Sequence, residues 1–163
     1  MERFKTPQTW LVLALALMLV GGVLAYLFHT SFGSVTVTRV AFETERGRLA
    51  GLLYLPRCAG ADDPRPALVT TTGYLNAREM QAAPAVEMSR REMVVLALDH
   101  YSHGNSFLHE IPPGNEFNSF WVYTIYDGVQ YLFDQPYVLK DAAGNGVIGV
   151  ITISTSTLYW SIG

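Results

Sequence analysis

Histidine and carboxylate side chains gather in the middle of this sequence, directly after a short hydrophobic run. His100, His103 and His109 lie close together, and Asp99 immediately precedes the first of them. Such spacings can place imidazoles on one metal ion, but no cysteine or regularly spaced carboxylate accompanies these three, so we expect no metal site. Asp99 follows an expected strand, a position where aspartate commonly accepts hydrogen bonds from loop amides. We therefore expect a structural turn at this point.

A second group of reactive side chains is the series of hydroxyls near the C-terminus. Ser154 stands among several serines and threonines at the end of a β-branched run, and a serine hydroxyl is a poor nucleophile without a base. A histidine of the 100–109 segment is one alternative for that base, because strand-end loops converge on one edge of a parallel sheet. The other interpretation is that Ser154 is one hydroxyl among many. Cys58, the only cysteine, excludes an internal disulfide and is expected to be an incidental loop residue.

The N-terminal part of the chain has the composition of a membrane span. Residues 9–28 are almost wholly apolar, and at about 1.5 Å per residue they match a hydrocarbon core of about 30 Å. Arg3 and Lys5 precede them, so residues 1–8 are expected in the cytoplasm and the domain outside a cell membrane crossed once. A cleaved signal peptide, with a small-x-small site at 23–25, is the alternative. A buried core helix is disfavoured because no polar face exists.

The remaining sequence alternates strands and helices after a linker at 29–34. Unbroken apolar runs such as MVVLAL at 93–98 are typical of strands covered on both faces. The alternation predicts an α/β domain at 35–163, with a mostly parallel sheet that begins with an antiparallel hairpin. The aromatic residues of 117–133 are expected to be helix core rather than a ligand cage. The expected strands are 35–43, 49–55, 67–72, 93–98 and 147–153, and the expected helices are 77–91 and 117–133.

The charge of the chain limits its partners. The formal net charge is −3, and the part after the apolar segment is slightly more acidic because Arg3 and Lys5 lie before it. Nucleic acid and anionic lipid both require clustered cations, and the sequence has no basic stripe. We therefore expect no nucleic-acid partner.

Three motifs occur in the order in which one family carries them. Residues 72–80 resemble the loop after the third strand of α/β-hydrolases, where bacterial members have His-Gly-Tyr-Leu-Asn. Residues 99–106 match the pattern D-x-x-G-H-G-x-S of the turn after the fourth strand, and residues 126–129 fit the helix before the nucleophile strand. Over about 35–150 the chain thus resembles the α/β-hydrolase superfamily, in particular bacterial membrane-anchored serine-hydrolase-like proteins.

This resemblance implies a partial α/β-hydrolase fold and an acyl-transfer site for an ester or peptide (amide) substrate, with no cofactor. In the family's register Ser154 occupies the nucleophile position of G-x-S-x-G, and the backbone N–H groups of Tyr74 and Thr155 form the oxyanion hole. The resemblance also implies structural roles for four residues in the loops after the third and fourth strands, namely Gly73, Asp99, His103 and Gly104.

The sequence also departs from the family pattern. Thr152 and Ser156 replace the glycines that flank the nucleophile, so we expect crowding at the elbow. Thr72 stands where the family often has histidine, and Ser102 replaces a glycine.

The family's catalytic Asp and His follow on later strands, whereas this sequence ends shortly after Ser154. We therefore expect an incomplete domain that spans the N-terminal half of the fold, inactive as this chain. The alternative is a membrane-tethered, non-catalytic interaction module, because an unpaired last strand is prone to strand-edge association.

Overall fold

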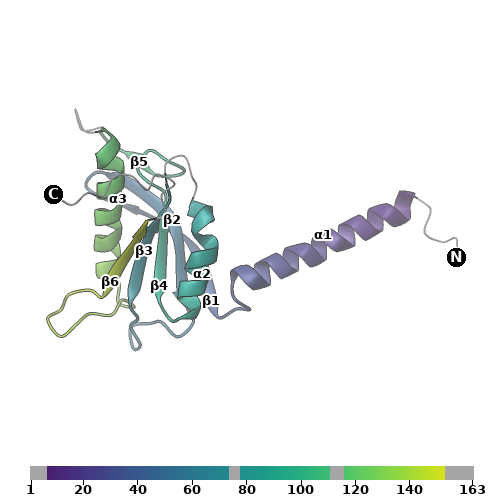
Figure 1. Cartoon of the computed structure of the whole chain (residues 1–163), viewed down its shortest axis with the longest axis horizontal. Coiled ribbons are helices and arrows are strands. Elements are labelled where there is room, and N and C mark those ends of the chain that lie inside the picture. Colours follow the sequence, from purple (N-terminus) through teal and green to yellow (C-terminus); the bar gives the residue numbers. More distant parts are fainter. Residues whose placement is uncertain (1–6, 74–77, 111–115, 153–163) are drawn as a thin grey trace.

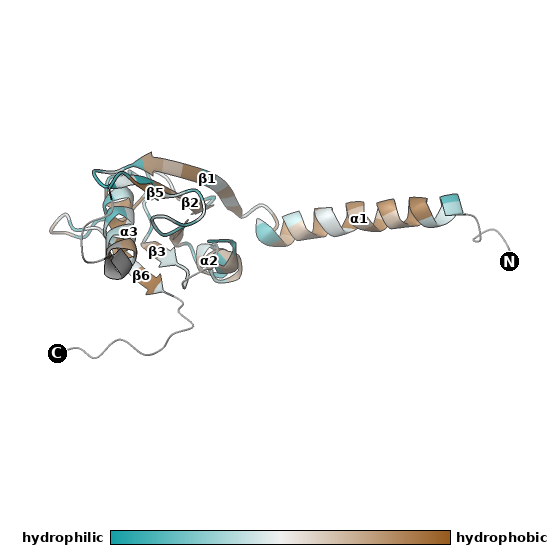
Figure 2. Ribbon diagram, turned by 90° about the horizontal axis from the view of Figure 1, so that it is seen from above, coloured by the Kyte–Doolittle hydropathy of each residue, from teal (hydrophilic) through white to brown (hydrophobic). Residues whose placement is uncertain are grey.

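The computed structural model describes residues 7–73, 78–110 and 116–152 of the chain. The first element, helix α1 (Pro7–His29), leads away from the rest of the molecule, and none of its residues is buried (Figure 1). It is the one described helix that is long and apolar enough to cross a membrane, with a mean hydropathy of 2.6. Figure 2 shows hydrophobic residues along most of the length of α1, with hydrophilic residues at its two ends.

The domain consists of one six-stranded sheet with helices on both faces (Figure 1). The main strand order is β1-β2-β4-β3-β6, and β5 pairs with β2. Pairing is parallel among β3, β4 and β6 and antiparallel where β2 meets β1, β4 and β5, so the α/β class is confirmed with a mixed sheet. The strands are β1 (Val35–Glu43), β2 (Gly47–Pro56), β3 (Ala67–Thr71), β4 (Val94–Leu98), β5 (Phe107–Leu108) and β6 (Ile148–Thr152).

The centre of the sheet is buried on both faces, as the unbroken apolar runs predict. Every residue of β3 and β4 is buried. Because successive strand residues point to opposite faces, the sheet divides its core into two clusters. One cluster includes Leu96, Leu98 and Leu132 on the side of helix α3 (Glu116–Phe133); the other includes Val95, Ala97 and Ala85 on the side of helix α2 (Ala82–Arg90). A short 3-10 helix, η1 (Arg78–Gln81), precedes α2.

Helix α3 lies close against the sheet at Gly128. A Cβ atom at this position would lie 2.5 Å from Leu98 Cδ1, a separation that side chains do not tolerate. Glycine therefore sets the distance between the helix and the two central strands, and it does so within a helix interior where glycine itself is unfavourable.

Two features of the sheet differ from expectation. The two-residue strand β5 follows the turn after β4 and was not expected, because two residues carry no periodic signal. The expected buried-type strand near the C-terminus is β6, yet Val150 and Ile151 are 45% and 38% exposed. That interpretation was wrong for the described residues, because β6 lies at the end of the strand order and only β3 pairs with it.

A tight turn joins α1 to the sheet. Ser31, Phe32 and Gly33 all have positive φ angles, and the Thr30 carbonyl accepts hydrogen bonds from the amides of Gly33 and Val35 at 3.0 and 3.1 Å. Only five residues, 30–34, therefore separate the last residue of α1 from the first residue of β1.

Candidate active site

The candidate site lies at the edge where the parallel strands end. Thr71 of β3 is the register partner of both Leu98 at the end of β4 and Thr152 at the end of β6. The ends of β3 and β4 and the last described residue of β6 therefore lie side by side. Thr72 and Gly73 follow β3, Asp99 follows β4, and the residues after Thr152 lie outside the described part of the chain.

The expected nucleophile and oxyanion donors, Ser154, Thr155 and Tyr74, lie outside the described residues. Their described neighbours in the chain are Gly73, which is buried, and Thr152, whose side chain is exposed. Thr152 takes ordinary strand conformation without a positive φ angle, and the other replaced glycine position, Ser156, lies outside the described residues, so the expected crowding at the elbow stays a prediction.

Asp99 holds together the loops at this edge. Its carboxylate, 4% exposed, pairs with the buried guanidinium of Arg78 and accepts a hydrogen bond of 3.1 Å from the amide of Asn105. Gly104 turns with a φ of 54°, and a Cβ there would lie 2.2 Å from Asp99 Oδ2. The glycine is thus required both by its conformation and by the closeness of the carboxylate.

The turn after β4 is further fixed by its own polar groups. Ser106 Oγ donates to the Asp99 carbonyl at 3.0 Å and accepts a hydrogen bond of 2.9 Å from the Ala50 amide. His103 Nδ1 lies 3.0 Å from the Tyr101 carbonyl, consistent with a structural imidazole. Ser102, in the place of the family's glycine, has a φ of 61°, a conformation that is unfavourable for a residue with a side chain.

His100 connects this turn to the loop after β3. Its Nε2 lies 2.6 Å from the Thr72 carbonyl oxygen and must carry the proton, because a carbonyl can only accept. The ring stacks on Trp121 at 5.0 Å between centroids, and Nδ1 is buried without a hydrogen-bond partner in the described part of the chain. Burial lowers the pKa of His100, against weaker opposing effects such as the hydrogen bond to Thr72. The neutral ring thus positions the peptide that precedes Gly73.

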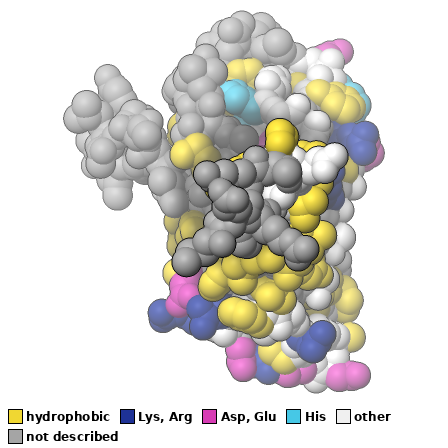
Figure 3. Space-filling model, turned by 90° about the vertical axis from the view of Figure 1, so that its right-hand side faces the viewer, with side chains coloured by type: hydrophobic (Ala, Val, Ile, Leu, Met, Phe, Trp, Pro, Cys, Tyr) yellow, Lys and Arg dark blue, Asp and Glu magenta, His cyan; other side chains and the backbone are white. Residues whose placement is uncertain are grey.

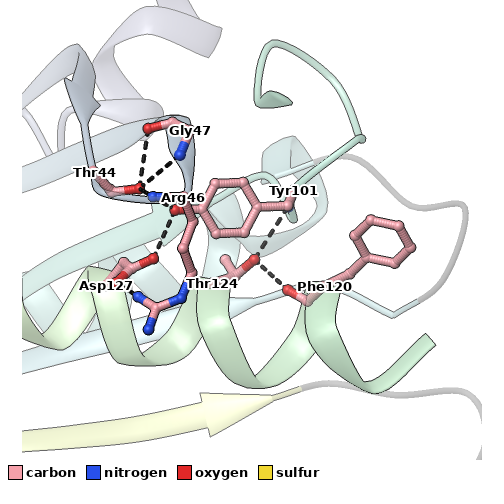
Figure 4. Close-up of polar contacts among 7 residues, drawn as sticks. All are labelled: Thr44, Arg46, Gly47, Tyr101, Phe120, Thr124 and Asp127. Carbon is pink, nitrogen blue, oxygen red and sulfur yellow. Dashed lines mark hydrogen bonds and ion pairs between the residues drawn. The ribbon is translucent and has the colours of Figure 1, made fainter. Parts of the chain in front are cut away.

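A second polar network joins the hairpin turn to α3 beside this edge (Figure 4). Asp127 accepts hydrogen bonds from Arg46 Nη1 and from the Tyr101 hydroxyl, both at 2.7 Å. Thr44 Oγ1 lies 2.5 Å from the same hydroxyl, and the Arg46 guanidinium covers the Tyr123 ring at 4.4 Å. Burial and the hydrogen bond to Asp127 raise the pKa of Tyr101, so the phenol remains protonated and serves as a donor.

Sequence reasoning missed this network. Arg46 and Asp127 are 81 positions apart, and nothing in their local pattern connects them. The available signal was an aspartate on the inner side of an expected helix, because a buried carboxylate requires a partner. The described residues contain no group of three or more His, Cys, Asp or Glu side chains that could hold a metal ion.

The fold resembles solved α/β-hydrolase structures. The α/β-hydrolase GrgF from Penicillium is 18% identical with a TM-score of 0.55, and an esterase from the archaeon Pyrobaculum calidifontis is 20% identical with a TM-score of 0.51. A hypothetical protein from Pseudomonas aeruginosa is 25% identical with a TM-score of 0.57. Each alignment covers 72% of this chain and 37%, 34% and 35% of the respective structure. No protein-family model and no curated protein matches the chain.

Proposed function

We propose, from the premise that this chain carries part of the α/β-hydrolase fold, that it belongs to a membrane-tethered serine hydrolase that transfers the acyl group of an ester or amide substrate. The solved structures that it matches include esterases, and the chain spans a little over a third of their length. The activity proposed is therefore that of the protein to which this segment contributes its nucleophile strand.

The observation that carries the proposal is the parallel register of β6 with β3. Thr152, the last described residue of β6, is the partner of Thr71, the last residue of β3, so the two strands run in parallel register up to the same edge of the sheet. Ser154 follows Thr152 by two residues, and Tyr74 follows Thr71 by three. A serine and a backbone amide that leave adjacent parallel strands in this way are suited to act on one carbonyl group.

In the proposed reaction the Ser154 hydroxyl attacks the substrate carbonyl, and the amides of Tyr74 and Thr155 donate hydrogen bonds to the oxyanion. The serine proton passes to a general base. His100 is unsuited to that role, because its Nε2–H is held by the Thr72 carbonyl and the other nitrogen is buried. Its contribution is to orient the Thr72–Gly73 peptide next to the proposed oxyanion hole.

An activity-based fluorophosphonate probe tests the nucleophile. The protein that contains this segment, in detergent, is expected to be labelled, and Ser154→Ala is expected to abolish the labelling. Ser156→Ala is the matched control, since it removes a hydroxyl two residues away and is expected to retain labelling. Absence of labelling of the unaltered protein would contradict the proposed serine nucleophile.

The tether is tested separately by fractionation of cells and N-terminal sequencing of the recovered protein. We propose that α1 is retained as a single span, with the domain on the extracytoplasmic side. Recovery of the protein in the membrane fraction with its original N-terminus is the expected result. A new N-terminus near Tyr26 would instead identify the segment as a cleaved signal peptide.

One observation favours a second candidate, a membrane-tethered interaction module. The outer edge of β6 has no partner strand among the described residues, and it carries the exposed side chains of Val150 and Ile151. Such an edge can pair with a strand of another segment or chain. A chain that the probe does not label but that captures a partner through β6 would support this function over catalysis.

A further inference from the structure

Strand β1 lies at the end of the strand order opposite β6, and among the described residues only β2 pairs with it. All nine of its residues pair with β2 in one unbroken register, so no bulge bends the strand away from a further neighbour. The strand also contains no proline and no lysine, which commonly protect a sheet edge. This edge is therefore regular enough to accept another strand.

The backbone groups that β1 offers at its free edge follow from its hydrogen bonds to β2. Thr44 and Gly47 exchange both of their backbone hydrogen bonds at the hairpin end, and the Ser34 carbonyl accepts one from the Arg57 amide at the other end. Because hydrogen-bonded positions alternate along an antiparallel pair, the even-numbered residues of β1 bond to β2. The amides and carbonyls of the odd-numbered residues of 37–43 therefore point away from β2.

The side chains at these odd-numbered positions carry opposite charges. Arg39 is exposed and has no ion-pair partner among the residues that the structure describes. The side chain of Glu43 is 67% exposed and has only a long contact of 3.8 Å with Arg48. Ala41, small and exposed, stands midway between Arg39 and Glu43. Because strand residues two apart point the same way, the cation and the anion share one face of β1.

These charges favour one way for two β1 strands to pair with each other. Free backbone groups must meet free backbone groups, so an antiparallel pair of β1 strands has to set odd-numbered residues opposite odd-numbered residues. Centred on Arg39, the pair places two arginines opposite each other, which is unfavourable. Centred on Ala41, it places Arg39 of each copy opposite Glu43 of the other. Opposite charges in directly opposed positions stabilise a strand pair.

The other face of β1 agrees with the register centred on Ala41. Val40 and Phe42 are half-buried and pack against the core on the α3 side. In this register Val40 of each copy lies opposite Phe42 of the other, so an apolar pair forms on either side of the symmetry axis. The Phe42 ring is already held by stacking on Tyr131, with ring centroids 4.1 Å apart. The pairing therefore extends the core of each copy across the interface.

The direction in which α1 leaves the domain is compatible with this pairing. Figure 2 shows α1 leaving the sheet at its β1 end, on the side that α2 covers and opposite α3. The two-fold axis of an antiparallel strand pair runs perpendicular to the sheet, so each face of the sheet stays on the same side in both copies. Both α1 helices then leave toward the same side of the dimer, as two spans in one bilayer must.

The surface around α1 does not oppose two copies side by side. Figure 3 views the molecule from the side on which α1 leaves the domain, and at the margins of this face Lys or Arg side chains, in dark blue, lie near Asp or Glu side chains, in magenta. Mixed charges give no surface of a single sign that would repel a second copy. Val35, where each β1 begins, lies about 20 Å along the strand from Ala41, so the two helices are about 40 Å apart and need not touch.

We propose that two copies of this chain form a dimer in which their β1 strands pair antiparallel about Ala41, so that one sheet runs through both copies. A second copy is the partner that this edge fits, because β1 itself carries both members of the charge pair. The interface uses neither the candidate active site nor the outer edge of β6, so it is independent of the proposed catalysis. A shared bilayer would favour the dimer further by raising the effective concentration of one copy near another.

Disulfide cross-linking tests the register. Cys58→Ser removes the exposed native cysteine, and Ala41→Cys is then introduced into that background. Oxidation of this double variant in detergent is expected to give a covalent dimer. Residues opposed as a hydrogen-bonded antiparallel pair have Cα atoms about 5.5 Å apart, a usual separation for a disulfide. Thr38→Cys in the same background is the control: this position is also exposed on β1, but its two copies lie about 20 Å apart in the proposed register and should not cross-link.

Charge reversal tests the ion pairs. Arg39→Glu places two carboxylates opposite each other at two places in the interface, so the association constant from sedimentation velocity of the full chain in detergent should fall about tenfold or more. The double variant Arg39→Glu/Glu43→Arg exchanges the two charges and is expected to restore association. Arg91→Glu reverses an exposed arginine after the end of α2 and should leave association unchanged.

Three outcomes would overturn the proposal. The first is that Cys58→Ser/Ala41→Cys gives no covalent dimer, and the second is that Cys58→Ser/Thr38→Cys cross-links equally well. The third is that Arg39→Glu/Glu43→Arg associates as weakly as Arg39→Glu alone. A dimer that persists in Arg39→Glu and does not cross-link at position 41 would place the contact elsewhere, such as between two α1 helices, and would also refute pairing through β1.

Discussion

The turn after β4 and strand β6 meet at the same sheet edge, but their groups are satisfied in different ways. In the turn, the carboxylate of Asp99 is buried and bonded to Arg78 and to the Asn105 amide. Strand β6 has all its described pairings on one side and exposes Val150 and Ile151. The polar groups of the turn are thus paired within this part of the chain, whereas β6 has an outer edge that is unpaired among the described residues and is able to accept a partner strand.

The largest expected effect on stability concerns the turn after β4, whose polar groups are buried and paired. Asp99→Asn keeps the side-chain volume but leaves the Arg78 guanidinium, 8% exposed, without its buried counter-charge. We expect the free energy of unfolding to fall by about 3 kcal/mol, measured by urea denaturation of the full chain in detergent. Asp63→Asn is the control: it breaks an exposed pair with Arg65 and should cost less than about 1 kcal/mol. Equal effects of the two changes would show that the Asp99 network is not buried.

The next effect is the pH dependence of the free energy of unfolding that the His100 ring causes. Burial lowers the folded-state pKa of this ring, while the unfolded chain titrates near the ordinary value of about 6.5. Stability is therefore unaffected above that pH. Below a pH of about 6.5, the unfolded state binds a proton at this histidine that the folded state does not bind. The free energy of unfolding therefore falls by up to about 1.4 kcal/mol per pH unit until the pH reaches the lowered pKa of the folded state.

Denaturation at pH 7.5 and 5.5 checks this slope. His100→Gln is expected to reduce the difference between the two pH values, since glutamine offers an N–H donor to Thr72 that does not titrate. His109→Gln, at an exposed position, should leave the slope unchanged. A slope that survives in His100→Gln would show that other groups cause it.

A smaller effect comes from the strained residue of the turn. Ser102 has a φ of 61°, so Ser102→Gly is expected to raise the free energy of unfolding by about 1 kcal/mol. Asn105→Gly, next to a glycine but without a positive φ, should give no gain. A loss of stability in Ser102→Gly would indicate that the serine side chain contributes more than its conformation costs.

The smallest effect on stability is expected for substitutions in strand β6, at the end of the described sheet. Val150→Lys or Ile151→Lys places a charge on the β6 edge and should change the free energy of unfolding by less than about 0.5 kcal/mol. Association of the full chain in detergent, measured by sedimentation velocity, should nevertheless decrease. Val122→Lys alters a more exposed apolar residue on α3 and should leave association unchanged.

Sequence patterns predicted the parts of the fold that depend on local periodicity. The buried runs of β3 and β4, the hairpin of β1 and β2, and helices α1 and α3 all follow from apolar spacing. The position of β2 beside β4 did not follow, because antiparallel pairing between distant strands leaves no local signal. Neither did the exposure of β6, since an apolar run looks alike in a central strand and at an edge.

In the candidate site, too, contacts within one loop were predicted from the sequence, whereas contacts between separate loops were not. The motif at 99–106 marked Asp99 and Gly104, and the structure places them in contact, because a short loop can only close around a near neighbour in sequence. Arg78, His100 and Asp127 were not marked as partners, since their contacts join separate loops across the edge. Ser154 and its proposed amide donors remain predictions.

The brevity of the segment between α1 and β1 has a consequence for what the domain can reach. Five residues, even fully extended, cover at most about 18 Å, and the left-handed turn at Ser31–Gly33 shortens the distance that the segment can span. If α1 spans a bilayer, as proposed, the domain samples a thin layer of solution next to the membrane rather than a broad volume. Its encounters would then be with molecules embedded in, or adsorbed to, the same leaflet.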